Sequence, residues 1–272
     1  MDDIKKILSS AKNKLISAGV PEGRDAEFIL EYVLGKKLTD YSRQNITVEQ
    51  MSEYNSLIER RLNREPLDSI FNSTEFLGLT ILFSKDTLTP RQETEIMTDS
   101  IVRENTEEGL RVLDLCTGSG CIGLALKKYL KNASVVLSDI SNLALNMAKY
   151  NAQINNIDVE YKQSDLFENI NGEYDIIVSN PPYIPSVDLD MLEKEVKDYD
   201  PILALDGGPD GLNFYRKIAE RINEFLAENG KVYIEFGINQ TEQITNLFKD
   251  KLKDIKIIKD YSGIDRYLKG KK

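Results

Sequence analysis

The residues with the clearest capacity for chemistry follow a short apolar run. Residues 174–178 predict a buried strand, and Asn180, Pro181, Pro182 and Tyr183 come shortly after it. The prolines stiffen the backbone and have no N–H, so carbonyl oxygens here are free to accept hydrogen bonds from another molecule. Asn180 adds a side-chain amide, and Tyr183 adds a flat face. These four residues predict a catalytic slot with acceptors at its floor and an aromatic wall, suited to a planar group that carries an N–H2.

An ordinary proline-rich loop is the alternative interpretation of this tetrad. Its position favours a binding function, because ligands in open α/β sheets bind at the carboxyl ends of parallel strands. A planar amide or amine nitrogen is a poor nucleophile and must become pyramidal to react. The Asn180 side-chain oxygen and the Pro181 carbonyl could accept its two N–H hydrogens in that transition state, while Tyr183 packs on the flat group. No strong base is needed, because the proton can leave once the nitrogen is cationic.

A glycine-rich segment after an earlier predicted strand is the candidate cofactor loop. Residues 118–123 match G-x-G-x-x-G between a strand at 110–115 and a helix, which permits a dinucleotide interpretation. Asp139 ends the next predicted strand, where a carboxylate can accept hydrogen bonds from both hydroxyls of a ribose. Asp165 follows the third predicted strand. The loop residues predicted to bind cofactor are Cys116, Thr117, Gly118, Ser119 and Gly120.

The elements that must position these residues change character along the chain. Apolar side chains at helical spacing predict three helices before Pro66, which is expected to end the helical part. Residues 74–83 predict a β-hairpin with its turn near Gly78. From about residue 110, strands and helices alternate, which is typical of a parallel sheet. We predict a helical domain at 1–72, a β-hairpin linker at 73–89 and an α/β domain at 90–272.

Two further stretches are polar or charged. Residues 184–211 form a long polar excursion before the next predicted helix. Arg60, Arg61 and Arg64 are interpreted as a solvated face, with a role in binding a partner as the open alternative.

Composition excludes several classes of function. The 272 residues include no His and two Cys, so zinc sites and Ser-His or Cys-His catalysis are effectively excluded. A carboxylate metal site is left open by the composition, but no metal site is predicted. A net charge of -10 argues against a protein that grips duplex nucleic acid by its phosphates. The sequence contains no run of the roughly 20 apolar residues that span a bilayer. With no apolar signal segment at the N-terminus, we expect a cytoplasmic protein without membrane partners.

The tetrad at 180–183 resembles the signature of S-adenosylmethionine-dependent methyltransferases that modify a planar amino or amide nitrogen. These include adenine methyltransferases and the release factor glutamine methyltransferases. The resemblance to the glutamine enzymes covers nearly the whole chain. It includes the helical N-terminal part and the segments 73–79, 90–95, 201–211, 235–237 and 263–266. Residues 68–72 depart from that family, because they lack the Tyr-Ile-x-Gly run that often precedes the hairpin.

The resemblance implies a fold and a set of roles. The fold is α/β, a Rossmann-like seven-stranded methyltransferase sheet preceded by a small all-helical domain and the hairpin. Asp114, four residues before Gly118, resembles the acid that helps hold the cofactor's ammonium through water or backbone. Asp139 would hold the ribose, and Leu166, beside Asp165, would lie against the adenine. Asn180 would contact both cofactor and substrate.

The implied activity is methyl transfer from S-adenosylmethionine to the glutamine amide in the Gly-Gly-Gln motif of peptide chain release factors. The helices of residues 1–72 are expected to recognise that protein substrate. An adenine methyltransferase acting on DNA or RNA is the alternative, and a non-catalytic cofactor-binding protein is a second one. Which release factor is modified, the oligomeric state and the turnover rate stay open.

Overall fold

The computed structural model of the chain describes residues 4–20, 24–37 and 46–272. Its contacts divide the chain into two compact units. The first comprises Met1–Asn72 together with Lys194–Tyr199, and the second comprises Ser73–Glu193 and Asp200–Lys272. No helix in the described ranges is long and apolar enough to cross a membrane.

The first unit is built from helices around its own apolar core. These are α1 (Ile4–Ser17), α2 (Asp25–Leu34), α3 (Val48–Leu62) and α4 (Leu67–Phe71). Gly35 ends α2 in the left-handed conformation that glycine adopts without strain. Thr47 begins α3 with a capping box, in which Thr47 and Gln50 each accept the other's backbone N–H. Local sequence therefore sets these helix ends.

Pro66 does not end the helical part, contrary to the sequence-based prediction. It precedes α4 as its N-cap residue. The N–H of a residue at a helix start has no partner within the helix, so a proline is tolerated there and its fixed φ suits the first turn. The helical part instead ends at Asn72, whose φ of 52° places it in the left-handed region.

The arginine run is not the solvated face that the sequence suggested. Arg61 pairs with Asp25 at 2.7 Å, and both side chains are largely buried. Arg60 pairs with Glu65 at 2.5 Å. Arg64 pairs with Glu195 at 2.6 Å. The last pair explains why residues 194–199, from the middle of the predicted α/β region, belong to the helical unit.

The second unit begins with the predicted hairpin, β1 (Ser73–Phe76) and β2 (Leu79–Leu82). The turn residues Leu77 and Gly78 both have positive φ, as a type I′ hairpin turn requires. Phe76, Leu79 and Ile81 are buried in the same apolar core as helices α5 and α6. The hairpin is therefore packed onto the α/β fold along its apolar side.

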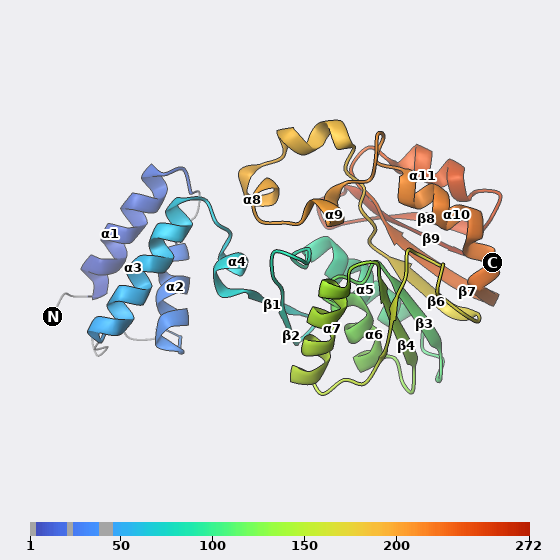
Figure 1. Ribbon diagram of the computed structural model, residues 1–272, viewed down its shortest axis with the longest axis horizontal. Coiled ribbons are helices and arrows are strands. Elements are labelled where there is room, and N and C mark those ends of the chain that lie inside the picture. The colour runs from blue at the N-terminus through green and yellow to red at the C-terminus, as the bar shows by residue number, and fades with distance from the viewer. Residues whose placement is uncertain (1–3, 21–23, 38–45) are drawn as a thin grey trace. The chain divides into compact units, whose positions relative to one another are not determined.

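The sheet of the second unit has seven strands in the order β5-β4-β3-β6-β7-β9-β8, which confirms the expected fold class (Figure 1). Strands β3 to β7 run parallel, and β9 is antiparallel to both β7 and β8. The sheet is thus mixed at one edge. The strands are β3 (Arg111–Leu115), β4 (Ser134–Asp139), β5 (Glu160–Gln163), β6 (Tyr174–Ser179), β7 (Leu226–Glu235), β8 (Lys253–Lys259) and β9 (Asp265–Lys271).

Helices cover both faces of this sheet (Figure 1). One face carries α5 (Gln92–Glu104), α6 (Cys121–Tyr129) and α7 (Asn142–Ile154), and the other carries α10 (Asn213–Phe225) and α11 (Thr241–Phe248). Successive strand residues point to opposite faces of the sheet. Val112 is therefore buried on the face that carries α5, α6 and α7, and Leu113 on the face that carries α10 and α11. Burial on both faces explains why the central strands are continuous apolar runs.

The polar excursion at 184–211 contains short helices that the sequence did not indicate. They are η2 (Ser186–Met191), α8 (Lys194–Lys197) and α9 (Ile202–Leu205). Each is too short to show a helical hydrophobic period, so periodicity had no signal to detect here.

The strand order creates a topological switch point. The chain leaves β3 for β4 and β5 on one side and returns as β6 on the other side. Leu115 of β3 pairs with Ser179 of β6, so the loops beginning at Cys116 and Asn180 leave the sheet side by side. This is where open α/β sheets bind ligands.

Candidate active site

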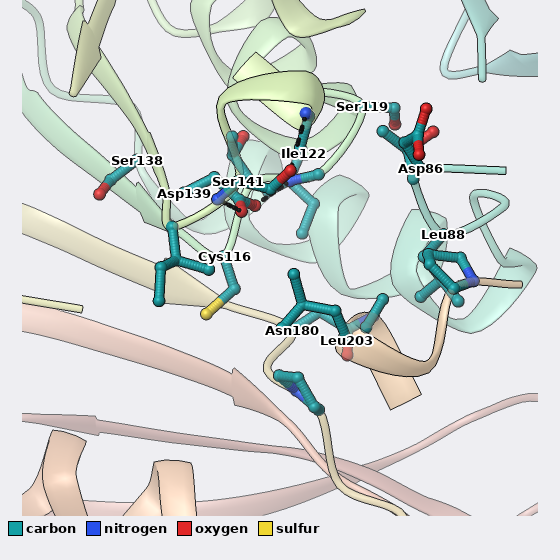
Figure 2. Close-up of a pocket in the computed structure, with 18 of the residues that line it drawn as sticks. Asp86, Leu88, Cys116, Ser119, Ile122, Ser138, Asp139, Ser141, Asn180 and Leu203 are labelled. Carbon is teal, nitrogen blue, oxygen red and sulfur yellow. Dashed lines mark hydrogen bonds between the residues drawn. The ribbon is translucent and has the colours of Figure 1, made fainter. Parts of the chain in front are cut away.

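A cavity of ≈ 300 Å³ opens at this switch point. Figure 2 shows Asp139, Ser141 and Cys116 on one side of it, with Asp86 and Leu88 on the other. Nine of the residues that the sequence nominated line it: Cys116, Thr117, Gly118, Ser119, Asp139, Asp165, Leu166, Asn180 and Pro182. Loops after β3, β4, β5 and β6 therefore converge on one space.

Asp114 is not among the lining residues and is fully buried below the loop. Its Oδ2 accepts hydrogen bonds from the Thr117 hydroxyl at 2.6 Å and the Gly123 N–H at 2.9 Å. Burial raises the pKa of Asp114 to about 7. The carboxyl group thus ties the glycine loop to the start of α6, and any effect on a cofactor passes through that loop.

The glycines of the loop have different surroundings. Gly118 has a φ of 55°, and a Cβ built there meets no atom within 4 Å. Gly120 has a φ of 84°, and a Cβ there would lie 3.0 Å from the Ala148 Cβ. Gly118 therefore leaves backbone exposed to the cavity, whereas Gly120 permits close packing of the loop on α7.

Asp139 has both carboxylate oxygens engaged with the backbone (Figure 2). Oδ2 accepts from the Gly118 N–H at 2.9 Å and Oδ1 from the Ser141 N–H at 2.8 Å. Burial raises the pKa of Asp139, and the backbone hydrogen bonds act in the opposite direction. Each carboxylate oxygen has a further lone pair for a ligand hydroxyl.

The third acidic position is more open. Asp165 lies 3.4 Å from the ammonium of Lys217. Leu166 beside it is buried, with a φ of 48°. The Ser164 hydroxyl donates to the Leu166 carbonyl at 2.8 Å, which holds this turn and places the leucine side chain as an apolar part of the cavity wall.

Only two of the four residues at 180–183 line the cavity. Asn180 and Pro182 line the cavity, whereas Pro181 and Tyr183 are not lining residues. The Tyr183 ring packs so closely on Gly237 that a Cβ there would lie 2.9 Å from it. Burial raises the pKa of Tyr183 to about 12. The predicted aromatic wall thus has its ring against the core in this structure, and its role toward a substrate stays a prediction.

The Asn180 carboxamide is held at one end only. Its Nδ2 donates to the Thr94 hydroxyl at 3.2 Å. Its Oδ1 is buried and has no hydrogen-bond partner among the described residues. Asn180 therefore lines the cavity and carries an amide oxygen that no described donor occupies, and its role toward a substrate stays a prediction.

Sequence reasoning missed one wall of the cavity. Residues 86–91 form part of it, and the excursion contributes Pro201, Leu203 and Ala204. Buried Asp200 joins these two segments, because it pairs with Arg91 and accepts the Thr89 N–H at 3.2 Å. The family resemblance at 90–95 and 201–211 was the signal that pointed to this wall.

The thiols show no sign of chemical activation. Burial raises the pKa of Cys116 and Cys121, the latter to about 12. Both are therefore neutral thiols near pH 7. Within residues 4–20, 24–37 and 46–272, no group of three or more His, Cys, Asp or Glu side chains is arranged to hold a metal ion.

Comparisons with known proteins identify the family of the chain. The model of the PrmC N-terminal domain matches residues 6–71, and that of the methyltransferase small domain matches residues 74–209. A release factor glutamine methyltransferase of Agrobacterium fabrum is 40% identical over 96% of this chain and 94% of its own. The chain belongs to the release factor glutamine methyltransferase family.

Other members of this family are similar over their full lengths. The enzyme of Geobacter sulfurreducens is 36% identical over 98% of this chain and 96% of its own. The enzyme of Streptococcus pneumoniae is 36% identical over 97% of this chain and 96% of its own. Membership of this family makes the chain a methyltransferase and confirms the resemblance seen in the sequence.

Solved structures confirm the methyltransferase fold. A Pyrococcus furiosus methyltransferase superposes with a TM-score of 0.53 at 19% identity, covering 71% of this chain and 89% of that one. A T. thermophilus 16S rRNA methyltransferase in complex with AdoMet and guanosine gives a TM-score of 0.53 at 18% identity, covering 74% and 49%.

Proposed function

We propose that this enzyme transfers a methyl group from S-adenosylmethionine to the side-chain amide nitrogen of the glutamine in the Gly-Gly-Gln motif of a peptide chain release factor. The observation that carries the proposal is the buried Oδ1 of Asn180, a residue that lines the cavity, because this oxygen has no hydrogen-bond partner among the described residues. A buried acceptor without a donor costs about 1–3 kcal/mol, which a substrate N–H at that position would recover.

The cavity residues fit the proposed cofactor. Gly118 exposes backbone without a side chain, as close approach of the methionine part requires. Asp139 offers carboxylate lone pairs to a ribose, and Leu166 offers an apolar surface to an adenine. Asp114 holds the loop from below, which supports the proposed indirect role of this carboxyl group toward the cofactor's ammonium.

The cofactor, when bound, supplies an electrophilic methyl group. The chain's contribution is to bind and polarise the nitrogen that receives it. Asn180 Oδ1 would accept one N–H hydrogen of the glutamine amide, and the Pro181 carbonyl is proposed to accept the other. Acceptors in fixed positions favour the pyramidal nitrogen over the planar amide, and so they stabilise the transition state more than the ground state.

Glutamine is favoured over adenine as the substrate, although both present a planar N–H2. The relatives that match nearly the whole chain are named as release factor glutamine methyltransferases. The net charge of -10 opposes binding to the dense phosphates of a duplex. Extracting a base from a duplex also costs a few kcal/mol of unstacking. A glutamine after two glycines can enter a narrow slot with little steric opposition.

The test is methyl transfer from labelled S-adenosylmethionine to purified release factor. We expect labelling of the wild-type factor and none when the Gly-Gly-Gln glutamine is changed to Glu. Adenine-containing DNA and RNA serve as competing acceptors. Labelling of nucleic acid alone would overturn the proposal, and labelling that persists in the Glu control would place the methyl group elsewhere on the factor.

The same assay tests Asn180 with a matched control. Asn180→Ala should lower the rate by about two to three decades, because one preorganised polar group is lost. Asn171→Ala removes the same side chain from an exposed position before β6 and should leave the rate unchanged. An Asn180→Ala variant with an unaltered melting curve and a rate near that of Asn171→Ala would show that Asn180 is not catalytic.

A further inference from the structure

Three side chains from three elements form a hydrogen-bonded series behind Asn180. Thr94, in the first turn of α5, is buried, and its hydroxyl donates to Glu235 Oε2 at 2.7 Å. Glu235 is the last residue of β7 and is also buried. Asn180 Nδ2 donates to the same Thr94 hydroxyl at 3.2 Å. Thr94 therefore lies between a carboxyl group and the amide that faces the cavity.

The direction of these hydrogen bonds determines how the amide is turned. A carboxylate can only accept, so the single hydrogen of the Thr94 hydroxyl is used on Glu235. The hydroxyl then has only lone pairs to offer Asn180, and the amide must present its N–H2 to Thr94. The Asn180 oxygen consequently faces the other way, where it is buried without a partner among the described residues.

We infer that Thr94 and Glu235 are positioning residues, which fix the Asn180 carboxamide with its oxygen free to accept the substrate N–H. The inference rests on the proposed function for the identity of that substrate. It gives a role to the Thr94 and Glu235 segments, which the sequence marked only by family resemblance. Neither residue touches the reacting atoms, and each acts through Asn180.

The charge of Glu235 is part of this arrangement. Burial raises the pKa of Glu235 to about 7, while the hydrogen bond from Thr94 favours the carboxylate. A protonated Glu235 can donate to Thr94, which frees the Thr94 hydrogen for the Asn180 oxygen and allows the amide to turn over. The group is charged above its pKa, so the orientation weakens as pH falls through about 7.

The other titratable groups around Glu235 do not change their charge near pH 7. Burial raises the pKa of Cys121 and Tyr183 to about 12 and that of Tyr215 well above its usual value, so all three stay neutral. The charged neighbours are Glu93, which raises the pKa of Glu235, and Arg266, which lowers it. These two lie 3.1 Å apart as an ion pair.

The decisive variants are Thr94→Val and Thr94→Ser. Valine keeps the shape of threonine without its hydroxyl, and serine keeps the hydroxyl. We expect Thr94→Val to lower kcat about tenfold to hundredfold, which is less than the loss of a direct contact. Thr94→Ser should stay within about threefold of wild type, and cofactor affinity by calorimetry should be unchanged in both. Equal kcat values for the two variants would overturn the inference.

The pH profile separates positioning from packing. The kcat of wild type and of Thr94→Ser should fall as pH falls through about 7, because the Glu235 carboxylate becomes protonated in that range. Glu235→Gln can donate or accept at any pH, so its kcat should be low and should lose the part of the pH dependence that Glu235 contributes. Asp114 also has a pKa raised to about 7, but it remains in every variant. A profile unchanged by Glu235→Gln would exclude the Glu235 role.

A substrate-free measurement makes the inference independent of the proposed function. The side-chain N–H2 signal of Asn180 can be followed by NMR in protein labelled at asparagine nitrogen, and assigned by its loss in Asn180→Ser. Its hydrogen exchange should be slow in wild type and Thr94→Ser and faster in Thr94→Val. If the release factor is not methylated, the proposed function fails, and this measurement still decides whether Thr94 holds the amide. Exchange that is equal in all three proteins would refute it.

Discussion

Two buried carboxyl groups, one on β3 and one on β7, support different parts of this site. Burial raises the pKa of both Asp114 and Glu235 to about 7. Asp114 accepts from Thr117 and Gly123 and so shapes the cofactor loop. Glu235 accepts from Thr94 and acts on the tetrad. Neither carboxyl group lines the cavity, and each acts through hydrogen bonds to other residues of the site.

Asp139 gives a prediction at the same scale. Asp139→Ala removes a carboxylate that lines the cavity and holds the N–H groups of Gly118 and Ser141. Charge-assisted hydrogen bonds are worth roughly 1.5–3 kcal/mol, so affinity for S-adenosylmethionine should fall about tenfold to hundredfold. Calorimetry measures this directly, and Glu168→Ala, an exposed acid outside the cavity, is the control. Tight NADH binding without any response to S-adenosylmethionine would favour the dinucleotide interpretation instead.

At the scale of elements, the start of α5 is bonded to several distant parts of the second unit. Arg91, just before the helix, pairs with Asp200. Glu93 reaches Arg266 of β9, and Thr94 reaches Glu235 of β7. Glu95 accepts the N–H of Leu77 in the hairpin turn at 2.8 Å. These bonds fix α5 to the hairpin, the sheet and the excursion. They explain how residues 90–95, which are far from residues 180–183 in the sequence, can position Asn180 of that tetrad.

The cap of α3 gives a prediction for the helical unit. The Thr47 hydroxyl accepts the Gln50 N–H at 3.2 Å. Thr47→Ala should lower the free energy of unfolding of this unit by about 1 kcal/mol, whereas Thr47→Ser, which keeps the oxygen, should be nearly neutral. Urea denaturation of the full chain provides the comparison. Affinity for S-adenosylmethionine should not change, because the cavity lies in the second unit; a loss of affinity would contradict that separation.

At the scale of the whole molecule, the helical unit is separate from the fold that carries the cavity. The sheet, its covering helices and all the lining residues belong to the second unit. The helical unit also includes residues 194–199, which lie between two parts of the second unit in the sequence. We propose that the helical unit recognises the release factor, since it is not needed to complete the sheet.

Removal of residues 1–72 tests this proposal. The truncated protein should bind S-adenosylmethionine with affinity within about threefold of the full chain, since its cavity is intact. Methylation of the full release factor should fall much further, with most of the loss in KM. A truncated enzyme of equal efficiency would reject the recognition role. Light scattering provides the control for aggregation, because the deletion removes the residues with which 194–199 form a compact unit.

Much of this fold follows from local signals in the chain. Apolar spacing gave the helices and strands, and Gly35, Thr47 and Gly78 marked a helix end, a helix start and a turn. The alternation of strands and helices also placed the glycine loop and Asn180 at strand ends. Such features depend on neighbours within a few residues, so they are visible without a structure.

Tertiary packing decided which of these residues act together. Thr94 and Glu235 are 141 residues apart, and Arg91 and Asp200 are 109 apart, so no local pattern relates either pair. Packing also turned the Tyr183 ring onto Gly237 and gave residues 194–199 to the helical unit. A side chain's direction and partner depend on how distant elements pack, since a strand exposes each residue to one face and the neighbouring elements determine what lies there.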